Sequence, residues 1–524
     1  MLIGDLIRRR AAISPHQEFW RDEELSISYD QLNRDANRIA RAILSEGLVP
    51  GDHVAICAGN GYEYAAIHFG AAKAGVVLTH LNPRLTAVEL TRLCTHSEAM
   101  LVFFGEAQQT VMDATRDSLP RVRKWIQMLE DSDDPVPGWA ESVSRWILPH
   151  TEEEPDLSRF SVQPGAPPVF PEAPFQMLYT SGTTGFPKGV LISHRAKLAH
   201  GTTHVINTGL QPGDQVWSAL PLYHQFAQWL ALVCVPMAGA TLFSANAFDP
   251  GKCWEALRNE GITHLPAVPT MLYRLLDHDL ASGAPPADLR CIVYGGAPMD
   301  AGRITTLRVC FPGARLFQGF GQTEVGYCLG LHNEDHQQRP ESLGKADLFS
   351  EILLVNEQGG EVAPGEVGEL IARTPYLMNG YHKDPAATEA FFQFGVGWGR
   401  TGDLATRDAE GYFTLAGRKV DMIISGGVNI YPMEIEKVLE AHPAVAEVAV
   451  IGIPDDDMGE SVHAVVVLNS GHNAGDLELT SHCREQLAGF KVPRSFTYAE
   501  SLPKTHTGKI RKVELRESFW SQYN

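Results

Sequence analysis

Short apolar runs alternate with helical patterns along most of the chain. The runs HVAICAG (53–59) and VVLTHLNP (76–83) have the length and composition of buried strands, and YEYAAIHFGAAKAG (62–75) between them is typical of a helix closed by glycine. Alternation of this kind predicts parallel sheets covered by helices, which is an α/β fold. In such folds ligands bind beyond the carboxyl ends of the strands.

Three further predicted strands each end at a helix or at a glycine-rich turn, which is where a ligand would be expected. ITHLPAV (262–268) precedes a predicted helix near 269–279, and both LRCIVYGG (289–296) and ARLFQGFG (314–321) read as strands that enter a glycine-rich turn. The Pro- and Glu-rich segment 151–174 is predicted to be a surface loop.

A chain of 524 residues is too long for one ordinary core, so at least two domains are expected. AGRKVDM (416–422) lies between one strand pattern and a new unit that contains AVAEVAVIGIP and SVHAVVVL. We therefore predict a large domain over 1–417 with parallel-sheet layers, and a small α+β domain over 418–524.

The charge balance limits the class of partner. The chain has 43 basic and 63 acidic side chains, a formal charge of −20, which argues against general binding to nucleic acid or to an anionic membrane. An anionic substrate would then need a local cationic site.

The eight cysteines form no CxxC pair, so neither a zinc ribbon nor a disulfide framework is indicated. No signal peptide, membrane-spanning apolar stretch or lipidation signal is recognised. These features predict a cytoplasmic protein with reduced thiols and no integral membrane association, and they are compatible with an oligomer.

The stretch YTSGTTGFPKGV (179–190) concentrates glycine, hydroxyl groups and one lysine. Such a composition is unsuited to the interior of a helix or a strand. Backbone N–H groups, the hydroxyls and Lys188 together would suit a phosphate, so we favour an anion cradle over a plain flexible loop. The stretch is not a Walker A loop, because Pro187 stands where that motif has its second glycine.

Other motifs carry weaker signals when taken singly. GFGQTE (319–324) fails as a dinucleotide fingerprint, but Glu324 after a turn suits Mg²⁺, although a carboxylate there is more often a helix-start charge. Asp403 in RTGDLA could accept two ribose hydroxyls, and Arg418 could bridge sugar and phosphate. Lys509 lies in PKTHTGKIRK, which otherwise reads as a solvated basic tail.

Taken together, the order YTSGTTGFPKG, YGGAP, GFGQTE, TGDLA, GRKVDMIISGGVNIYPMEIE, PKTHTGKIRK resembles the adenylate-forming superfamily over about residues 20–515. That superfamily includes acyl-CoA synthetases, adenylation domains of peptide synthetases and beetle luciferases. The resemblance implies a large N-terminal domain, a small mobile C-terminal domain and an active site between them. It also implies two half-reactions: ATP–Mg²⁺ and a carboxylate give an acyl-adenylate and pyrophosphate, and a thiol then displaces AMP.

The resemblance also implies roles for individual residues. The nucleotide and its metal would be bound by Thr180, Ser181, Gly182, Thr183, Thr184, Gly185, Lys188, Gly295, Gly296, Ala297, Gly321, Gln322, Thr323, Glu324 (the Mg²⁺ ligand), Asp403, Arg418 and Lys509. The acyl pocket would be lined by His224, Ala227, Gln228 and Gly295, with His224 in a gating role. Gly426, Gly427 and Lys491 would lie along the path of CoA.

Two departures from the family pattern stand out. The hinge residue two positions after Arg418, commonly Asp or Lys, is Val420, and a glycine of the acyl-tunnel motif is Ala227. Val420 bears on the balance between the two orientations of the mobile C-terminal domain. Ala227 bears on the shape of the wall of the acyl tunnel.

The function expected is therefore that of an acid–CoA ligase that activates an organic or fatty carboxylate. Loading of a carrier-protein thiol in trans is the main alternative, for which FKVPR (490–494) is only weakly unfavourable. A luciferase-like oxygenase is disfavoured. A non-catalytic acyl- or nucleotide-binding protein is also disfavoured, because Lys188, Glu324, Asp403, Arg418 and Lys509 are all intact.

Overall fold

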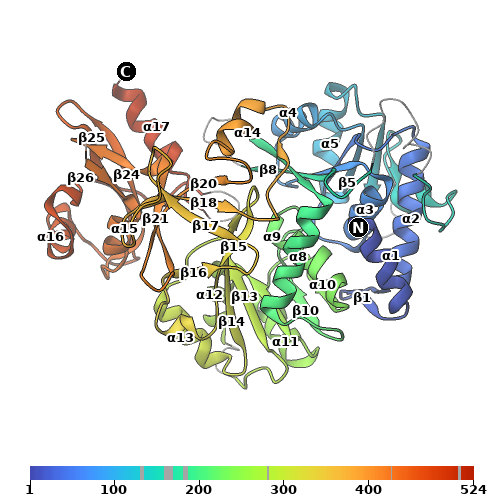
Figure 1. Ribbon diagram of the computed structural model, residues 1–524, viewed down its shortest axis with the longest axis horizontal. Coiled ribbons are helices and arrows are strands. Elements are labelled where there is room, and N and C mark those ends of the chain that lie inside the picture. The colour runs from blue at the N-terminus through green and yellow to red at the C-terminus, as the bar shows by residue number, and fades with distance from the viewer. Residues whose placement is uncertain are drawn as a thin grey trace. The chain divides into compact units, whose positions relative to one another are not determined.

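The computed structural model describes residues 1–129, 135–157, 169–180, 187–279, 283–426, 428–504 and 509–523. The chain divides into two compact units (Figure 1). Unit 1 comprises Met1–Glu351 and Ala372–Gly399, and unit 2 comprises Ile352–Ile371 and Arg400–Asn524. The domain boundary expected at 417/418 falls within unit 2 and stays a prediction. The α/β class, with a large N-terminal and a small C-terminal part, is confirmed.

Unit 1 contains a sheet of eight strands in the order β19-β9-β8-β4-β3-β5-β6-β7. The strands from β8 to β7 run parallel, while β9 pairs antiparallel with both β8 and β19. Their bounds are β3 His53–Cys57, β4 Val77–Leu81, β5 Leu101–Gly105, β6 Lys124–Met128, β7 Glu141–Ser142, β8 Pro174–Thr180, β9 Lys188–Ser193 and β19 Gly380–Tyr381.

The first predicted strand–helix–strand unit is confirmed in this sheet. Strands β3 and β4 pair in parallel, with Val54 opposite Leu78. Between them α3 (Tyr62–Ala74) ends at Gly75, whose φ of 75° is left-handed and which glycine adopts without a Cβ penalty.

A second sheet of unit 1 follows the order β16-β15-β14-β13-β12-β10-β11-β1-β2. It is parallel from β14 to β1, as predicted, and antiparallel at both ends. The bounds are β1 Glu18–Arg21, β2 Ser26–Ser28, β10 Gln215–Ser218, β11 Thr241–Ser244, β12 His264–Ala267, β13 Cys291–Gly295, β14 Arg315–Gln322, β15 Gly326–Leu331 and β16 Ser342–Ala346.

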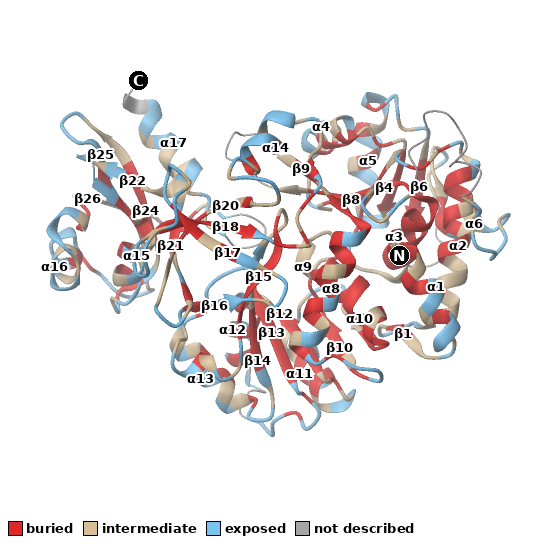
Figure 2. Ribbon diagram, in the orientation of Figure 1, coloured by how far each residue is buried: buried red, intermediate tan, exposed pale blue. Residues whose placement is uncertain are grey.

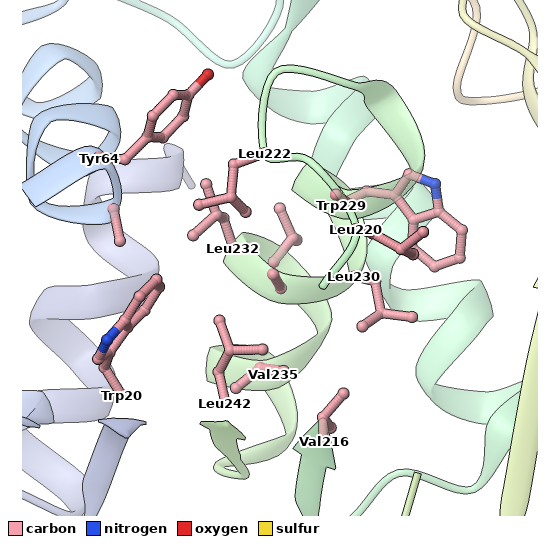
Figure 3. Close-up of a cluster of buried hydrophobic side chains, with 14 of the residues drawn as sticks. Trp20, Tyr64, Val216, Leu220, Leu222, Trp229, Leu230, Leu232, Val235 and Leu242 are labelled. Atoms are coloured by element: carbon pink, nitrogen blue, oxygen red, sulfur yellow. The ribbon is translucent and has the colours of Figure 1, made fainter. Parts of the chain in front are cut away.

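Helices cover these sheets and bury an apolar core (Figure 2). The main helices are α1 Ile3–Ile13, α2 Tyr29–Ser45, α4 Ala87–Ser97, α5 Gln109–Thr115, α6 Val143–Ile147, α8 His194–Thr208, α9 Gln225–Trp229, α10 Val235–Ala238, α11 Pro250–Asn259, α12 Pro269–Leu276, α13 Ala301–Cys310 and α14 Pro385–Phe391. A π-helical turn, η3 (Leu230–Cys234), joins α9 to α10. Figure 3 shows part of this core, with Trp229, Leu230 and Val216 on the side away from Trp20 and Tyr64.

Unit 2 has two sheet segments. One follows the order β17-β18-β20-β21, and the other follows β23-β22-β25-β24 with β26 beside β25. The bounds are β17 Glu351–Val355, β18 Gly368–Arg373, β20 Gly399–Arg407, β21 Phe413–Arg418, β22 Ile423–Ser425, β23 Val428–Ile430, β24 Val445–Asp455, β25 Gly459–Leu468 and β26 Ser495–Tyr498, with helices α15 Pro432–Glu440, α16 Asp476–Gln486 and α17 Lys512–Tyr523. An aliphatic core of its own, which includes Ile435, Val450 and Val466, stabilises this unit.

Among the described residues, no helix is both long enough and apolar enough to cross a membrane.

Candidate active site

The predicted phosphate cradle begins and ends in paired strands. Strands β8 and β9 are antiparallel, and their last register pair joins Thr180 to Lys188. The sequence had excluded a strand interior for this stretch, and that prediction was wrong at its two ends, because Tyr179–Thr180 and Lys188–Val190 belong to the ladder. The residues between, which include the predicted ligands Ser181, Gly182, Thr183, Thr184 and Gly185, lie outside the described residues.

The structure brings this hairpin together with the GFGQTE motif. Glu324 lies in the turn between β14 and β15, and its Oε1 accepts hydrogen bonds from Thr180 Oγ1 at 3.2 Å and from the Tyr381 hydroxyl at 3.1 Å. Lys188 Nζ stands 4.8 Å from the centroid of the Tyr381 ring, in a cation–π contact. Burial and the Glu324 carboxylate raise the pKa of Tyr381, which keeps its hydroxyl a donor.

Tyr381 was missed at the sequence level. It lies on β19, which has two residues and pairs with β9 so that Tyr381 is opposite Val190. A strand this short leaves no periodic signal, and only its pairing places the phenol beside Glu324.

Glycines allow the carboxyl ends of β13 and β14 to approach closely. A Cβ on Gly295 would collide with the Gly319 carbonyl, and one on Gly321 would collide with that of Gly326. Gly296, with φ of 84°, and Ala297 are exposed just beyond β13. Gly321 and Gln322 belong to β14 itself, so this strand runs further than the expected entry into a turn, and Thr323 is the first residue after it. The ligand roles of these residues stay predictions.

His224 occupies the N-cap position of α9, and its ring lies 4.6 Å from that of Tyr223. Ala227 and Gln228, the other predicted acyl-pocket residues, are buried. Two residues after His224, the partly buried Phe226 packs against a small core cluster formed by Cys291, Val293, Phe317 and Tyr327. These aromatic neighbours were not singled out from the sequence, since an aromatic residue on a strand is more often ordinary core.

In unit 2, Asp403 and Arg418 face each other across β20 and β21. Arg418 Nε donates to Asp403 Oδ1 at 2.9 Å, and Asp403 is buried whereas half of the Arg418 side chain is exposed. Loss of hydration and the Arg418 charge lower the pKa of Lys509, while the Asp403 carboxylate opposes this effect. The three polar residues predicted from separate motifs are therefore electrostatically coupled within one unit.

The residues predicted to lie along the path of CoA, and the predicted hinge, belong to unit 2. Gly426, with φ of 56°, follows β22, and Gly427 lies outside the described residues. Lys491 Nζ forms an ion pair with Glu434, at 2.6 Å to Oε1. The predicted hinge, Val420, is half-exposed in a 3₁₀ turn, and its carbonyl accepts a hydrogen bond from Arg516 at 2.9 Å. None of these observations tests the CoA or hinge roles.

The oxygen groups around Glu324 suit Mg²⁺ better than a transition metal. They comprise one carboxylate and two hydroxyls, and Mg²⁺ commonly takes one or two protein carboxylates together with substrate phosphates. Within the described residues, no cluster of three or more His, Cys, Asp or Glu side chains could hold a metal by protein ligands alone.

The family model described as AMP-binding enzyme matches residues 7–382, and the model of the AMP-binding enzyme C-terminal domain matches residues 434–509. The chain belongs to the AMP-binding enzyme family. This confirms the expected membership of the adenylate-forming superfamily and of its acyl-CoA synthetase branch. It also makes the chain an enzyme rather than a binding protein alone.

Three relatives illustrate the branch. The chain is 35% identical to feruloyl-CoA synthase of Amycolatopsis sp over 99% of both chains. It is 32% identical to long-chain-fatty-acid–CoA ligase FadD13 of Mycobacterium tuberculosis over 99% of this chain and 98% of that one. It is also 32% identical to fatty acid–[acyl-carrier-protein] ligase ScoC of Streptomyces coeruleorubidus over 95% and 92%.

Among solved structures, ATP-bound MatB from Rhodopseudomonas palustris superposes with a TM-score of 0.88, at 27% identity and with full coverage of both chains.

Proposed function

We propose that this enzyme is an ATP-dependent acid–CoA ligase that makes an acyl-adenylate and then an acyl-CoA. The observation that carries the proposal is the meeting of Thr180, Lys188 and Glu324 around Tyr381, because it joins two motifs of the resemblance into one polar site. Family membership supports the same chemistry.

In the first half-reaction a carboxylate oxygen attacks the α-phosphorus of ATP, the bond to the β-phosphate breaks, and pyrophosphate leaves. Lys188 supplies a positive charge at the mouth of the cradle, and Glu324 would hold Mg²⁺, which neutralises phosphate charge when bound. Thr180 and Tyr381 orient the Glu324 carboxylate by their hydrogen bonds. The proposed roles of Asp403 and Arg418 are to hold the ribose, and that of Lys509 is to stabilise charge on the α-phosphate.

In the second half-reaction the CoA thiol, having lost its proton, attacks the acyl carbonyl, and the bond to AMP breaks. Adenylation is needed because oxide is a very poor leaving group from a carboxylate, whereas AMP is an acceptable one. The loop at Gly426 and Gly427 and the side chain of Lys491 are the groups of this chain proposed to guide CoA.

A carrier-protein thiol as acceptor is the second candidate, favoured by the similarity to ScoC. One assay separates the two: a panel of aromatic, alicyclic and fatty acids is incubated with ATP, and the release of pyrophosphate and of AMP is measured without an acceptor, with CoA and with a carrier protein. Turnover that needs CoA supports the ligase, and turnover only with an added carrier protein supports the alternative. No pyrophosphate release with any acid would refute both.

A further inference from the structure

Residues 374–382 of unit 1 form a segment, here called the bracing segment, that contacts two parts of the candidate site. The Met378 backbone N–H donates to the Glu324 carbonyl at 2.9 Å. Further along, the His382 N–H donates to the Gly189 carbonyl of β9 at 2.7 Å. Strand β9 begins with the lysine of the predicted phosphate cradle, so one segment is bonded both to the turn that carries the carboxylate and to the strand that carries the cation.

The bracing segment also contacts the two residues that follow Glu324. Thr374 Oγ1 donates to the Val325 carbonyl at 3.0 Å, and both residues are buried. Gly326 adopts φ of 70°, and a Cβ on it would come within 2.6 Å of the Tyr376 Cβ, so the turn and the bracing segment are in direct contact there. A shift of Tyr376 would therefore displace the backbone directly after Glu324.

Tyr376, which is 2% exposed, is held in place through its hydroxyl. The hydroxyl donates to the Asp347 carboxylate, at 3.2 Å to Oδ1 and 3.4 Å to Oδ2, and it forms a second hydrogen bond with Thr203 Oγ1 of α8 at 2.5 Å. Asp347 itself accepts the Phe349 N–H at 2.7 Å and the Ser350 hydroxyl at 3.0 Å. These bonds connect the bracing segment to α8 and to the loop that follows β16.

The ionisation states of the two side chains favour this arrangement near neutral pH. Burial raises the pKa of Asp347 to about 6, so its carboxyl group is mostly ionised at pH 7 and accepts the bond. Burial and the Asp347 charge raise the pKa of Tyr376, so its hydroxyl stays protonated and donates. A hydrogen bond to an ionised carboxylate is stronger than one between two neutral groups, so this bond is suited to fixing the position of the tyrosine.

We propose that Tyr376 is a positioning residue for the metal site. Its bonds to Asp347 and Thr203 hold the bracing segment, and through that segment the Glu324 carboxylate, in the orientation that binds Mg²⁺ with ATP. The inference rests on the proposed function, in which Glu324 holds the metal. Mg²⁺ demands near-ideal octahedral geometry, so a small displacement of a carboxylate ligand lowers its affinity. Groups that orient the ligands of a metal typically contribute about 10- to 100-fold to that affinity.

The test measures Mn²⁺ binding to the full chain in the presence of ATP by electron paramagnetic resonance, and it needs no acid substrate. Mn²⁺ is a suitable probe because it prefers the same oxygen ligands as Mg²⁺. Tyr376→Phe keeps the ring against Gly326 and removes only the hydroxyl. We expect it to weaken Mn²⁺ binding by about 10-fold, and to raise the Mg²⁺ concentration for half-maximal pyrophosphate release by a similar factor.

Two substitutions of Asp347 provide a second comparison. Asp347→Asn keeps an oxygen that can accept the bond from Tyr376, whereas Asp347→Leu removes the acceptor. We expect Asp347→Asn to retain most of the Mn²⁺ affinity, and Asp347→Leu to lose about as much as Tyr376→Phe. Equal Mn²⁺ affinity in the two Asp347 variants would overturn the inference, and this comparison decides even if Tyr376→Phe does not fold.

Tyr29→Phe is the matched control. The Tyr29 hydroxyl is also buried and donates to the Ala240 carbonyl at 2.6 Å, but Tyr29 belongs to α2 and Ala240 directly precedes β11, and neither element carries a residue of the candidate site. Tyr29→Phe should lower the thermal midpoint as Tyr376→Phe does, and it should leave Mn²⁺ binding unchanged. An equal loss of Mn²⁺ affinity in the two variants would overturn the inference, because a general loss of stability would then explain both.

Glu324→Gln separates the inference from the function on which it rests. Wild-type Mn²⁺ affinity in Tyr376→Phe together with a loss in Glu324→Gln would overturn the positioning role and leave the metal role of Glu324 intact. Unchanged affinity in Glu324→Gln would refute the metal role, and the inference with it. Failure of the ligase would appear instead as an absence of pyrophosphate release from the wild type with every acid.

Discussion

The hydroxyl of Thr180 donates a hydrogen bond to Glu324, 144 residues further along the chain, at 3.2 Å. Tyr381 donates to the same carboxylate oxygen from a third segment. A carboxylate held by two hydroxyl donors is oriented before any substrate arrives, which reduces the reorganisation that catalysis would otherwise require.

Replacement of Glu324 by Gln keeps the shape of the side chain but removes its charge. We expect pyrophosphate release to fall by at least about 100-fold, and to recover in part at high Mg²⁺ concentration. Tyr381→Phe removes only one of the hydrogen bonds to Glu324 and should cost less than about 10-fold. The check is pyrophosphate release as a function of Mg²⁺ concentration, and a Glu324→Gln enzyme with normal Mg²⁺ dependence would exclude the metal role.

Lys509→Ala should separate the half-reactions. The ammonium is proposed to stabilise charge only while the α-phosphate is attacked, so adenylate formation should drop by at least about 100-fold, whereas supplied acyl-adenylate should still yield thioester. Lys504→Ala is the control, because Lys504 is bound to Glu447 and has no proposed role. Equal losses in the two assays would contradict the assignment.

Gly295→Ala should destabilise unit 1, since the added Cβ would collide with the Gly319 carbonyl of the adjacent strand. Backbone atoms cannot rotate away, so a cost of about 1–3 kcal/mol is expected. Gly59→Ala provides the comparison, because nothing lies within 4 Å of a Cβ at that position. Thermal unfolding measures the difference in stability between Gly295→Ala and Gly59→Ala. Similar midpoints would show that β13 and β14 can move apart at Gly295 without a cost in stability.

Lys197 is buried with its Nζ 2.9 Å from Gln225 Oε1, and burial lowers its pKa to about 7. Between this pKa and the ordinary lysine pKa of 10.5, the unfolded state binds a proton that the native state does not, so stability rises with pH. Lys197→Met removes this dependence, and we expect it to stabilise the protein at pH 7 by about 1–4 kcal/mol. The gain should shrink as the pH approaches 10.

Urea unfolding of Lys197→Met and the wild type near pH 7 and near pH 10 checks this prediction. Lys252→Met, at an exposed lysine, controls for the loss of a charge. A pH-independent difference between Lys197→Met and the wild type would mean that Lys197 stays charged in the native state.

Val420→Pro tests the proposed hinge. A pivot must absorb a large change in backbone dihedrals, and proline fixes φ near −65°. One half-reaction should survive and the other should be lost, whereas Val420→Ala should retain both. The carbonyl that accepts the Arg516 hydrogen bond is present in both variants, so that contact does not confound the comparison. Parental rates in both half-reactions for the proline variant would place the pivot elsewhere.

The sequence predicted the parallel sheets well because a strand buried on both faces reads as a continuous apolar run, as in 53–57 and 77–81. It also predicted Glu324 and Lys188 as site residues, since their motifs are local. It did not predict Tyr381, whose position depends on pairing with a distant strand. Nor did it single out His200 and His204, which are buried on α8, because a lone histidine in a helical pattern is usually structural.

The pairing of β8 with β9 affects which positions of the predicted phosphate cradle (179–190) can change independently in evolution. Thr180 and Lys188 are partners in the ladder, so strand pairing sets the position of the Lys188 backbone. Substitutions among residues 181–186 that keep the length of this segment would then change the hydroxyls of the proposed phosphate cradle, while Lys188 keeps its partner on β8. Selection on nucleotide preference would act on residues 181–186, and selection on the position of the positive charge would act on Lys188 and its strand. The first set of positions could then vary while the second stays constant.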